Sequence, residues 1–178
     1  IPKLGFGTYK IKSGEPTYLS VRHALDIGYR HIDVAQRYLN EEDVGNAIQD
    51  SHIKREDIFL TTKVWNSELT FKQTMNSIDK SLKKLKVDYL DLVLIHWPRP
   101  VYIREDVKMC IERNNEVWSA LEKLYDDGKA KSIGVSNFFI HHLEPLIENA
   151  KIVPHVNQIR FTPGLESYTL YSPRTTYD

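Results

Sequence analysis

The chain has 178 residues, of which 41% are hydrophobic and 27% are charged, a composition typical of an ordinary soluble globular protein. Lysine plus arginine equals aspartate plus glutamate at 24 each, so no overall positive charge favours binding to nucleic acid or to an anionic membrane. With one cysteine, no apolar run of roughly 20 residues and no signal-peptide pattern, we expect a single cytoplasmic domain over residues 1–178.

Strand and helix patterns alternate along the first half of the chain. A short strand near residues 4–7 precedes a helix over 16–27, whose end is marked by Gly28. A second strand follows at 31–35, and a helix over 41–49 begins after Asn40, a residue type that caps helix N-termini. Glu41, Glu42 and Asp43 suit the positive end of that helix, and we expect them to be ordinary surface charges.

The alternation continues through the second half. Residues 58–64 form the third predicted strand, Thr70 caps the next helix, and residues 89–97 form the most apolar strand. A long segment over 98–114 leads to a predicted helix from about Asn115 to Tyr125. A fifth strand over 131–138, a short helix over 142–150 and a sixth strand over 153–159 complete the pattern. This order indicates an α/β fold with a parallel sheet.

Six such units match a (β/α)8 TIM barrel better than a doubly wound sheet, although pattern alone leaves both open. In such a barrel the carboxyl ends of the strands meet at one mouth. Each predicted strand from the second to the sixth ends in polar residues: Asp33, Lys63, His96, Ser136 with Asn137, and Asn157 with Gln158. Their recurrence favours a shared functional site.

Each of these residues also has a structural interpretation. Asp33 alone is as easily a cap or a hydrogen-bonded buried acid, His96 alone is more often a packed histidine, and Tyr38 alone is a loop aromatic. Lys63 is harder to explain in this way, because a buried lysine requires a carboxylate partner. The functional interpretation rests on the convergence of three successive strand ends.

Five motifs in order carry a resemblance to a known family. They are HIDVAQRYLNEEDVG at 31–45, TTKVW at 61–65, LIHWP at 94–98, GVSNF at 134–138 and VNQ at 156–158. With these motifs the chain resembles the aldo-keto reductases over residues 1–158, and its short loops look most like the small-aldehyde and 2,5-diketo-gluconate reductase branch.

The resemblance implies reduction of a small aldehyde or ketone with a nicotinamide cofactor, usually NADPH, with NADH still open. It implies that Tyr38 is the general acid, that Lys63 lowers its pKa, that Asp33 pairs with Lys63, and that His96 orients the carbonyl. By the same resemblance the cofactor would contact Thr8, Asp33, Ser136, Asn137, Gln158, Tyr171 and Ser172. Tyr9, Trp65, His96 and Trp97 would line the substrate pocket.

The C-terminal segment departs from the family pattern. An eight-stranded barrel needs two more strands after Gln158, but only 20 residues remain, and Pro163-Gly164 disfavours a crossover helix. We therefore expect a barrel that is incomplete after the sixth strand, with missing or deleted segments in 160–178. Arg160, Thr162 and Val34 also differ from the usual residues. A monomer is expected, with self-association if the sheet edges are open.

The competing hypothesis is a catalytically incompetent relative or fragment that serves as a cofactor-binding interaction module. Two other interpretations fail on the residues. Gly5-Phe6-Gly7 lacks the third glycine and the helix of a dinucleotide-binding fingerprint. His141-His142 lacks acidic or cysteine partners at ligand spacing, so we expect no metal site.

Overall fold

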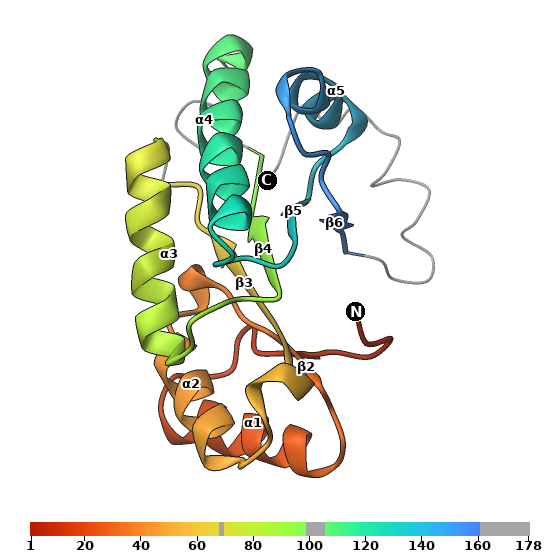
Figure 1. Ribbon diagram of the computed structural model, residues 1–178. Helices are drawn as coiled ribbons and strands as arrows, with labels where there is room; N and C mark the ends of the chain where they lie inside the picture. The colour runs from red at the N-terminus through yellow and green to blue at the C-terminus, as the bar shows by residue number, and fades with distance from the viewer. Residues whose placement is uncertain (68–69, 99–105, 161–178) are drawn as a thin grey trace.

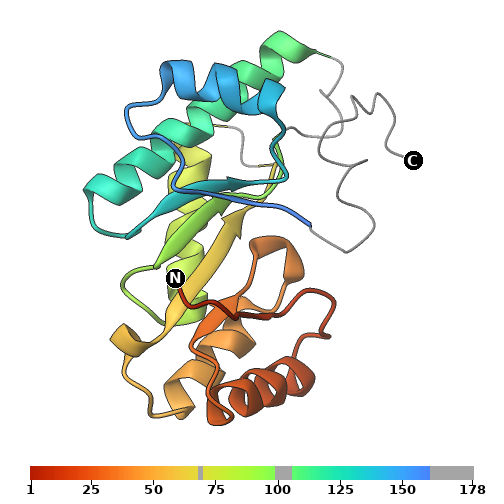
Figure 2. The same cartoon turned by 90° about the vertical axis from the view of Figure 1, so that its right-hand side faces the viewer.

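The computed structural model describes residues 1–67, 70–98 and 106–160. Within these residues, six parallel strands form one sheet in chain order, β1-β2-β3-β4-β5-β6. Their bounds are β1 Phe6–Gly7, β2 His31–Asp33, β3 Phe59–Val64, β4 Leu92–Ile95, β5 Ile133–Ser136 and β6 Val156–Gln158. The sheet curls into part of a barrel (Figures 1 and 2). Within the described residues, the prediction of a (β/α)8 barrel that is incomplete after the sixth strand is thus confirmed.

In the described part of the chain, five α-helices follow the strands and lie on the outer side of the curled sheet (Figures 1 and 2). They are α1 Glu15–Asp26, α2 Glu41–Asp50, α3 Phe71–Leu85, α4 Val107–Asp126 and α5 Ile140–Asn149. Two short 3-10 helices, η1 Gln36–Tyr38 and η2 Arg55–Asp57, lie in the connections. The right-handed repetition of strand, helix and parallel strand leaves the carboxyl ends of all strands at one mouth.

The core lies between the convex face of the sheet and the helices. β4 and β5 are buried along their whole length, as expected for a parallel sheet with both faces covered. Helix α3 contributes Ile78 and Leu85, and α4 contributes Trp118 and Leu121. The Trp118 indole donates from Nε1 to the backbone oxygen of Ile152 at 3.1 Å, so the largest core side chain also satisfies its polar atom.

Two helix boundaries follow the predicted chemistry. The Thr70 side chain accepts a hydrogen bond from the backbone N–H of Gln73 and caps α3. Gly28 follows α1 with φ of 104°, a conformation that glycine adopts without steric cost.

Helix α4 begins earlier than predicted, at Val107 and not near Asn115. The Asp106 carboxylate accepts from the N–H of Met109 and caps this first turn. The prediction was wrong because polar Asn114 occupies a buried position between Cys110 and Val117, and it interrupts the apolar spacing.

Helix α2 starts after Asn40 as predicted, but two side chains at this start differ from their predicted roles. Asn40 stands at the N-cap position, but its amide nitrogen donates to the backbone oxygen of Thr8 at 3.1 Å and does not cap the helix. Glu41 is not a surface charge: it is 2% exposed and accepts from the Thr62 hydroxyl at 2.8 Å. Asn40 ties the start of α2 to the segment after β1, and Glu41 ties it to β3.

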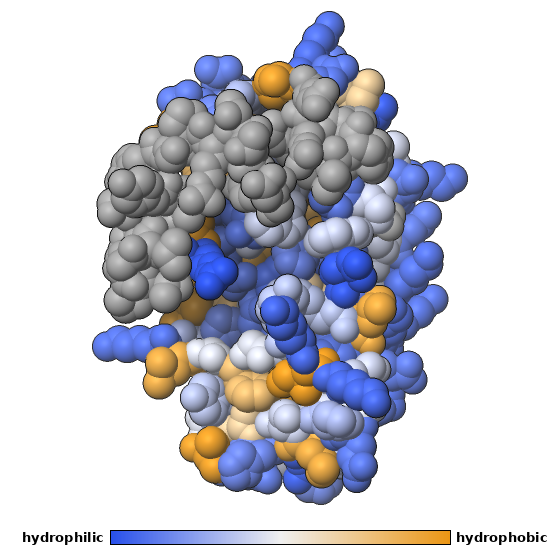
Figure 3. All heavy atoms as spheres, turned by 180° about the vertical axis from the view of Figure 1, so that it is seen from behind, coloured by the Kyte–Doolittle hydropathy of each residue, from blue (hydrophilic) through white to orange (hydrophobic). Residues whose placement is uncertain are grey.

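The outer surface is of mixed polarity. Figure 3 shows the molecule from behind, with hydrophilic residues (blue) over most of the described surface and hydrophobic residues (orange) in groups between them. Within the described part of the chain no helix is both long and apolar enough to cross a membrane.

Candidate active site

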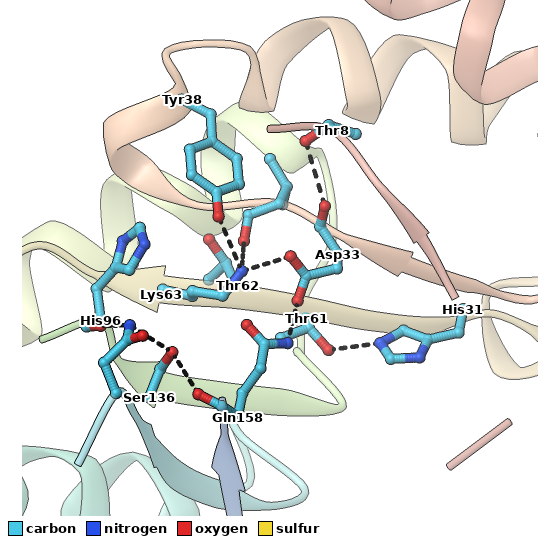
Figure 4. Close-up of polar contacts among 12 residues, drawn as sticks. Thr8, His31, Asp33, Tyr38, Thr61, Thr62, Lys63, His96, Ser136 and Gln158 are labelled. Atoms are coloured by element: carbon cyan, nitrogen blue, oxygen red, sulfur yellow. Dashed lines mark hydrogen bonds and ion pairs between the residues drawn. The ribbon is translucent and has the colours of Figure 1, made fainter. Parts of the chain in front are cut away.

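The carboxyl ends of β2 and β3 bring Asp33 and Lys63 into direct contact (Figure 4). The Lys63 side chain is 1% exposed, and its ammonium donates to Oδ1 of Asp33 and to the backbone oxygen of Val34 at 3.2 Å. A buried ammonium is tolerated only when it is paired and hydrogen-bonded. The predicted pairing of these two residues is confirmed.

Tyr38 reaches the same ammonium from the loop between β2 and α2. It ends the 3-10 helix η1, and Lys63 Nζ lies 3.4 Å from its hydroxyl oxygen (Figure 4). The half-buried phenol ring lies edge-on to the His96 ring, with 5.6 Å between centroids. Tyr38, Lys63 and Asp33 therefore form a continuous polar chain beside His96.

The pKa of Tyr38 is shifted in the direction opposite to the expected one. Burial, then the negative charge of Asp33, raises the pKa of the Tyr38 phenol. Burial also lowers the pKa of Lys63, and the Asp33 carboxylate opposes that change. The net shift is upward because burial and the Asp33 charge both disfavour the phenolate, and a lowering of the Tyr38 pKa by Lys63 stays a prediction.

His96 directly follows the buried strand β4 and is neutral at ordinary pH. Burial, followed by the nearby Lys63 charge, lowers the pKa of His96 to about 4. Its Nδ1 is buried and has no hydrogen-bond partner among the described residues. The ring is flanked by Tyr38 and by Trp65, whose centroid is 5.2 Å away. A neutral imidazole in this position can donate to or accept from a ligand oxygen.

A second polar group joins the ends of β5 and β6 to this cluster. The Ser136 hydroxyl donates to the backbone oxygen of Gln158 at 2.9 Å, and the Asn137 amide donates to Ser136 Oγ at 3.0 Å. Gln158 in turn donates from Nε2 to Asp33 Oδ2 at 2.8 Å (Figure 4). The structure thus brings together these three predicted cofactor-contacting residues. Asn157 instead donates to the backbone oxygen of Phe138 at 2.8 Å.

Thr8 fixes the backbone of Asp33. It is fully buried, and its N–H and its hydroxyl both donate to the backbone oxygen of Asp33, at 2.9 Å and 3.2 Å. These bonds hold β2 against the segment that follows β1.

Sequence reasoning missed Gln36, which holds the η1 loop. Its Oε1 accepts from the N–H of Trp65 at 3.0 Å, and its Nε2 donates to the hydroxyls of Ser77 and Ser81 at 3.1 Å and 3.2 Å. The side chain therefore ties the Tyr38 loop to the end of β3 and to α3. The sequence signal for this role was the amide side chain of Gln36, two residues before Tyr38, the predicted general acid.

A cleft of about 1610 Å³ opens over these residues. Most of the predicted site residues line it, namely Tyr9, Asp33, Tyr38, Trp65, His96, Trp97, Ser136, Asn137 and Gln158. Lys63 and Thr8 lie beneath this surface, at 1% and 0% exposure. Tyr9 is 64% exposed, and its ring contacts that of Tyr38 with 5.1 Å between centroids. Tyr171 and Ser172 lie outside the described residues.

The residues present fit a nicotinamide cofactor. The cleft is larger than the roughly 300–1,000 Å³ typical of small-ligand pockets, so it has room for a dinucleotide and a small substrate. Ser136, Asn137 and Gln158 offer hydroxyl and amide groups suited to a carboxamide, close to the polar chain of Tyr38. The described residues contain no group of three or more His, Cys, Asp or Glu placed to hold a metal ion.

Comparison with known proteins gives consistent matches. The family model described as "Aldo/keto reductase family" matches residues 3–170. Glyoxal reductase of Bacillus subtilis is 46% identical over 165 residues, which cover 93% of this chain and 56% of that protein. A solved aldo/keto reductase from Brucella melitensis is 48% identical with a TM-score of 0.82, over 90% of this chain and 59% of the other.

A solved Bombyx mori aldo-keto reductase in complex with NADP is 34% identical with a TM-score of 0.78, over 90% of this chain and 55% of the other. The chain thus spans little more than half the length of these relatives. The family match extends from the segment before β1 to beyond β6, and it includes each of the strand ends that meet at the cleft. The chain belongs to the aldo/keto reductase family.

Proposed function

We propose that this chain reduces small aldehydes or ketones with a nicotinamide cofactor and that Tyr38 donates the proton. The observation that carries the proposal is the placement of the Lys63 ammonium between the Asp33 carboxylate and the Tyr38 hydroxyl, beside His96. The names of the relatives, glyoxal reductase among them, support a small-aldehyde substrate.

With a raised pKa, Tyr38 is protonated at neutral pH, which is the state that a proton donor needs. At neutral pH the phenol keeps its proton until a strong base, such as the alkoxide formed from a carbonyl, develops beside it. Lys63 Nζ, 3.4 Å from the phenol oxygen, then stabilises the phenolate that remains. Asp33 keeps the ammonium in place, and neutral His96 holds the carbonyl oxygen by a hydrogen bond.

The cofactor supplies the hydride when it is bound. Ser136, Asn137 and Gln158 would hold its carboxamide, and Thr8 would keep the backbone of Asp33 in position beneath it. NADPH is the proposed form because a solved relative was obtained with NADP. Tyr171 and Ser172 stay predictions as cofactor contacts, as do the single-domain organisation, the cytoplasmic location and the monomeric state.

The test is NADPH consumption with a small aromatic aldehyde, with the unmodified chain compared to Tyr38→Phe. We expect the variant to lose about 10²- to 10⁴-fold in kcat, because it retains the ring but not the proton. Cofactor binding, followed by protein fluorescence, should be unchanged. Equal turnover in both proteins would remove Tyr38 from the reaction.

The second candidate is a cofactor-binding interaction module. It is favoured by one observation: within the described residues β1 and β6 each pair with a single neighbour, so each presents a strand edge. Such a module would bind NADPH without turnover of any aldehyde, and the same assay distinguishes it.

A further inference from the structure

The cleft carries an excess of positive charge. The one acidic residue among the described residues that line it is Asp33, which is already paired with Lys63. The lysines and arginines that line it are Lys3, Lys10, Arg37 and Arg160. The local field therefore favours anionic ligands, in a chain whose overall charge is balanced.

Arg37 occupies a particular place in this cleft. It directly precedes Tyr38 in η1, and its guanidinium carbon lies 5.5 Å from the centroid of the Trp65 ring. The Trp65 ring contacts the His96 ring in turn, with 5.2 Å between centroids. Arg37 thus lies on the same wall of the cleft as Trp65 and His96: it contacts Trp65, and Trp65 contacts His96.

The guanidinium has donors left to offer. Arg37 is exposed, and among the described residues it forms no ion pair with a carboxylate. A cation–π contact with the Trp65 indole does not use the guanidinium N–H donors, which remain for an anion. These donors can bind a carboxylate through two parallel hydrogen bonds, which a lysine ammonium cannot do.

We propose that Arg37 recognises a carboxylate on the substrate, so that the preferred substrates are small aldehydes or ketones that also carry a carboxylate. The proposal rests on the proposed reductase function, because it names the substrate class of that same site. Among the lysines and arginines that line the cleft in the described residues, Arg37 is the one that contacts the Trp65 ring, and it is adjacent in sequence to the proton donor.

The test uses a matched pair of substrates, 4-carboxybenzaldehyde and its methyl ester. The two share the ring and the aldehyde and differ in the negative charge of one group. We expect the unmodified chain to prefer the carboxylate in kcat/KM, and Arg37→Gln to lose about three- to tenfold for the carboxylate and less than twofold for the ester. Arg37→Lys should recover part of the loss, since it restores the charge but not the planar fork.

Lys54→Gln is the control for net charge. Lys54 is exposed, precedes η2 at the amino end of β3, and does not line the cleft. The preference for the carboxylate should remain in this variant. Raised salt should reduce the preference of the unmodified chain for the carboxylate over the ester. The ratio of kcat/KM for the two substrates should not change with salt in Arg37→Gln.

Titration calorimetry of both aldehydes separates the proposal from the reductase function. If no aldehyde is reduced but the carboxylate binds more tightly than the ester and loses this advantage in Arg37→Gln, carboxylate recognition by Arg37 stands and the reductase function fails. The proposal is overturned if the unmodified chain treats carboxylate and ester alike, or if Lys54→Gln removes the preference as fully as Arg37→Gln does.

Discussion

Gln158 Nε2 donates to Asp33 Oδ2 at 2.8 Å, and this bond joins β6 to β2 although the two strands are not neighbours in the sheet. Neighbouring strands lie about 4.8 Å apart, so a flat sheet would hold these two strands roughly 19 Å apart. Side chains of this size cannot span that distance. The bond therefore requires a curled sheet, and it excludes the flatter doubly wound alternative.

The same bond predicts a stability effect. Replacing Gln158 with leucine removes a donor to a carboxylate that is 16% exposed. We expect the free energy of unfolding to fall by about 1–3 kcal/mol, as measured by urea denaturation. Gln49→Leu, the same chemical change on the exposed side of α2, serves as the control. Equal stability of the two variants would show that the bond contributes nothing.

His96 should make stability depend on pH. The unfolded histidine takes up a proton near pH 6.5, whereas burial lowers the pKa of folded His96 to about 4. Between these values the unfolded state binds more protons, so stability is fully present above pH 6.5 and is lost as pH falls toward 4. Relative to His96→Gln, the unmodified chain should lose up to about 3 kcal/mol across this window. Parallel pH profiles of the two proteins would contradict this assignment.

Gly134 should not tolerate a side chain. It pairs with Val156 across β5 and β6, and a Cβ at Gly134 would lie 2.4 Å from the backbone oxygen of Val156. Gly134→Ala should cost about 1–3 kcal/mol of unfolding free energy, because the strand pair must separate. Gly7→Ala, where a Cβ meets nothing within 4 Å, should stay within about 0.5 kcal/mol. Thermal or urea unfolding distinguishes the two.

Gln36 should act on the reaction through Tyr38. Gln36→Leu breaks the bonds to Trp65, Ser77 and Ser81 that hold η1, and we expect kcat to fall about tenfold with little change in KM for the cofactor. Hydrogen exchange at the Trp65 amide should accelerate, because this N–H loses its acceptor. The exposed Gln49→Leu is again the control. Unchanged exchange at Trp65 would show that the loop is held by other contacts.

Much of the fold could be predicted from local pattern. The apolar strands, the polar residues at their carboxyl ends and the caps at Thr70 and Gly28 depend on residues close together in the chain, and the structure agrees with them. The pairing of Asp33 with Lys63 could also be predicted, because a lysine at the end of a buried strand needs a nearby carboxylate.

The predictions that were wrong depend on distant residues. Glu41 was predicted at the surface, but Thr62, from another strand, makes its burial possible. Asn40 was predicted as a cap, but its amide turns to Thr8, which no local pattern indicates. The early start of α4 was hidden because a buried asparagine resembles an exposed one in sequence.

The sequence by itself determined the order of the elements, the polar strand ends and the candidate catalytic group, because periodicity and residue chemistry act over short distances. Only the tertiary structure decided the protonation of that group and the surroundings of the cleft. Burial and a neighbouring carboxylate raise the pKa of Tyr38, and the cation–π contact of Arg37 with Trp65 exists only once η1 and the end of β3 are folded together. Desolvation and long-range contacts are properties of the packed molecule.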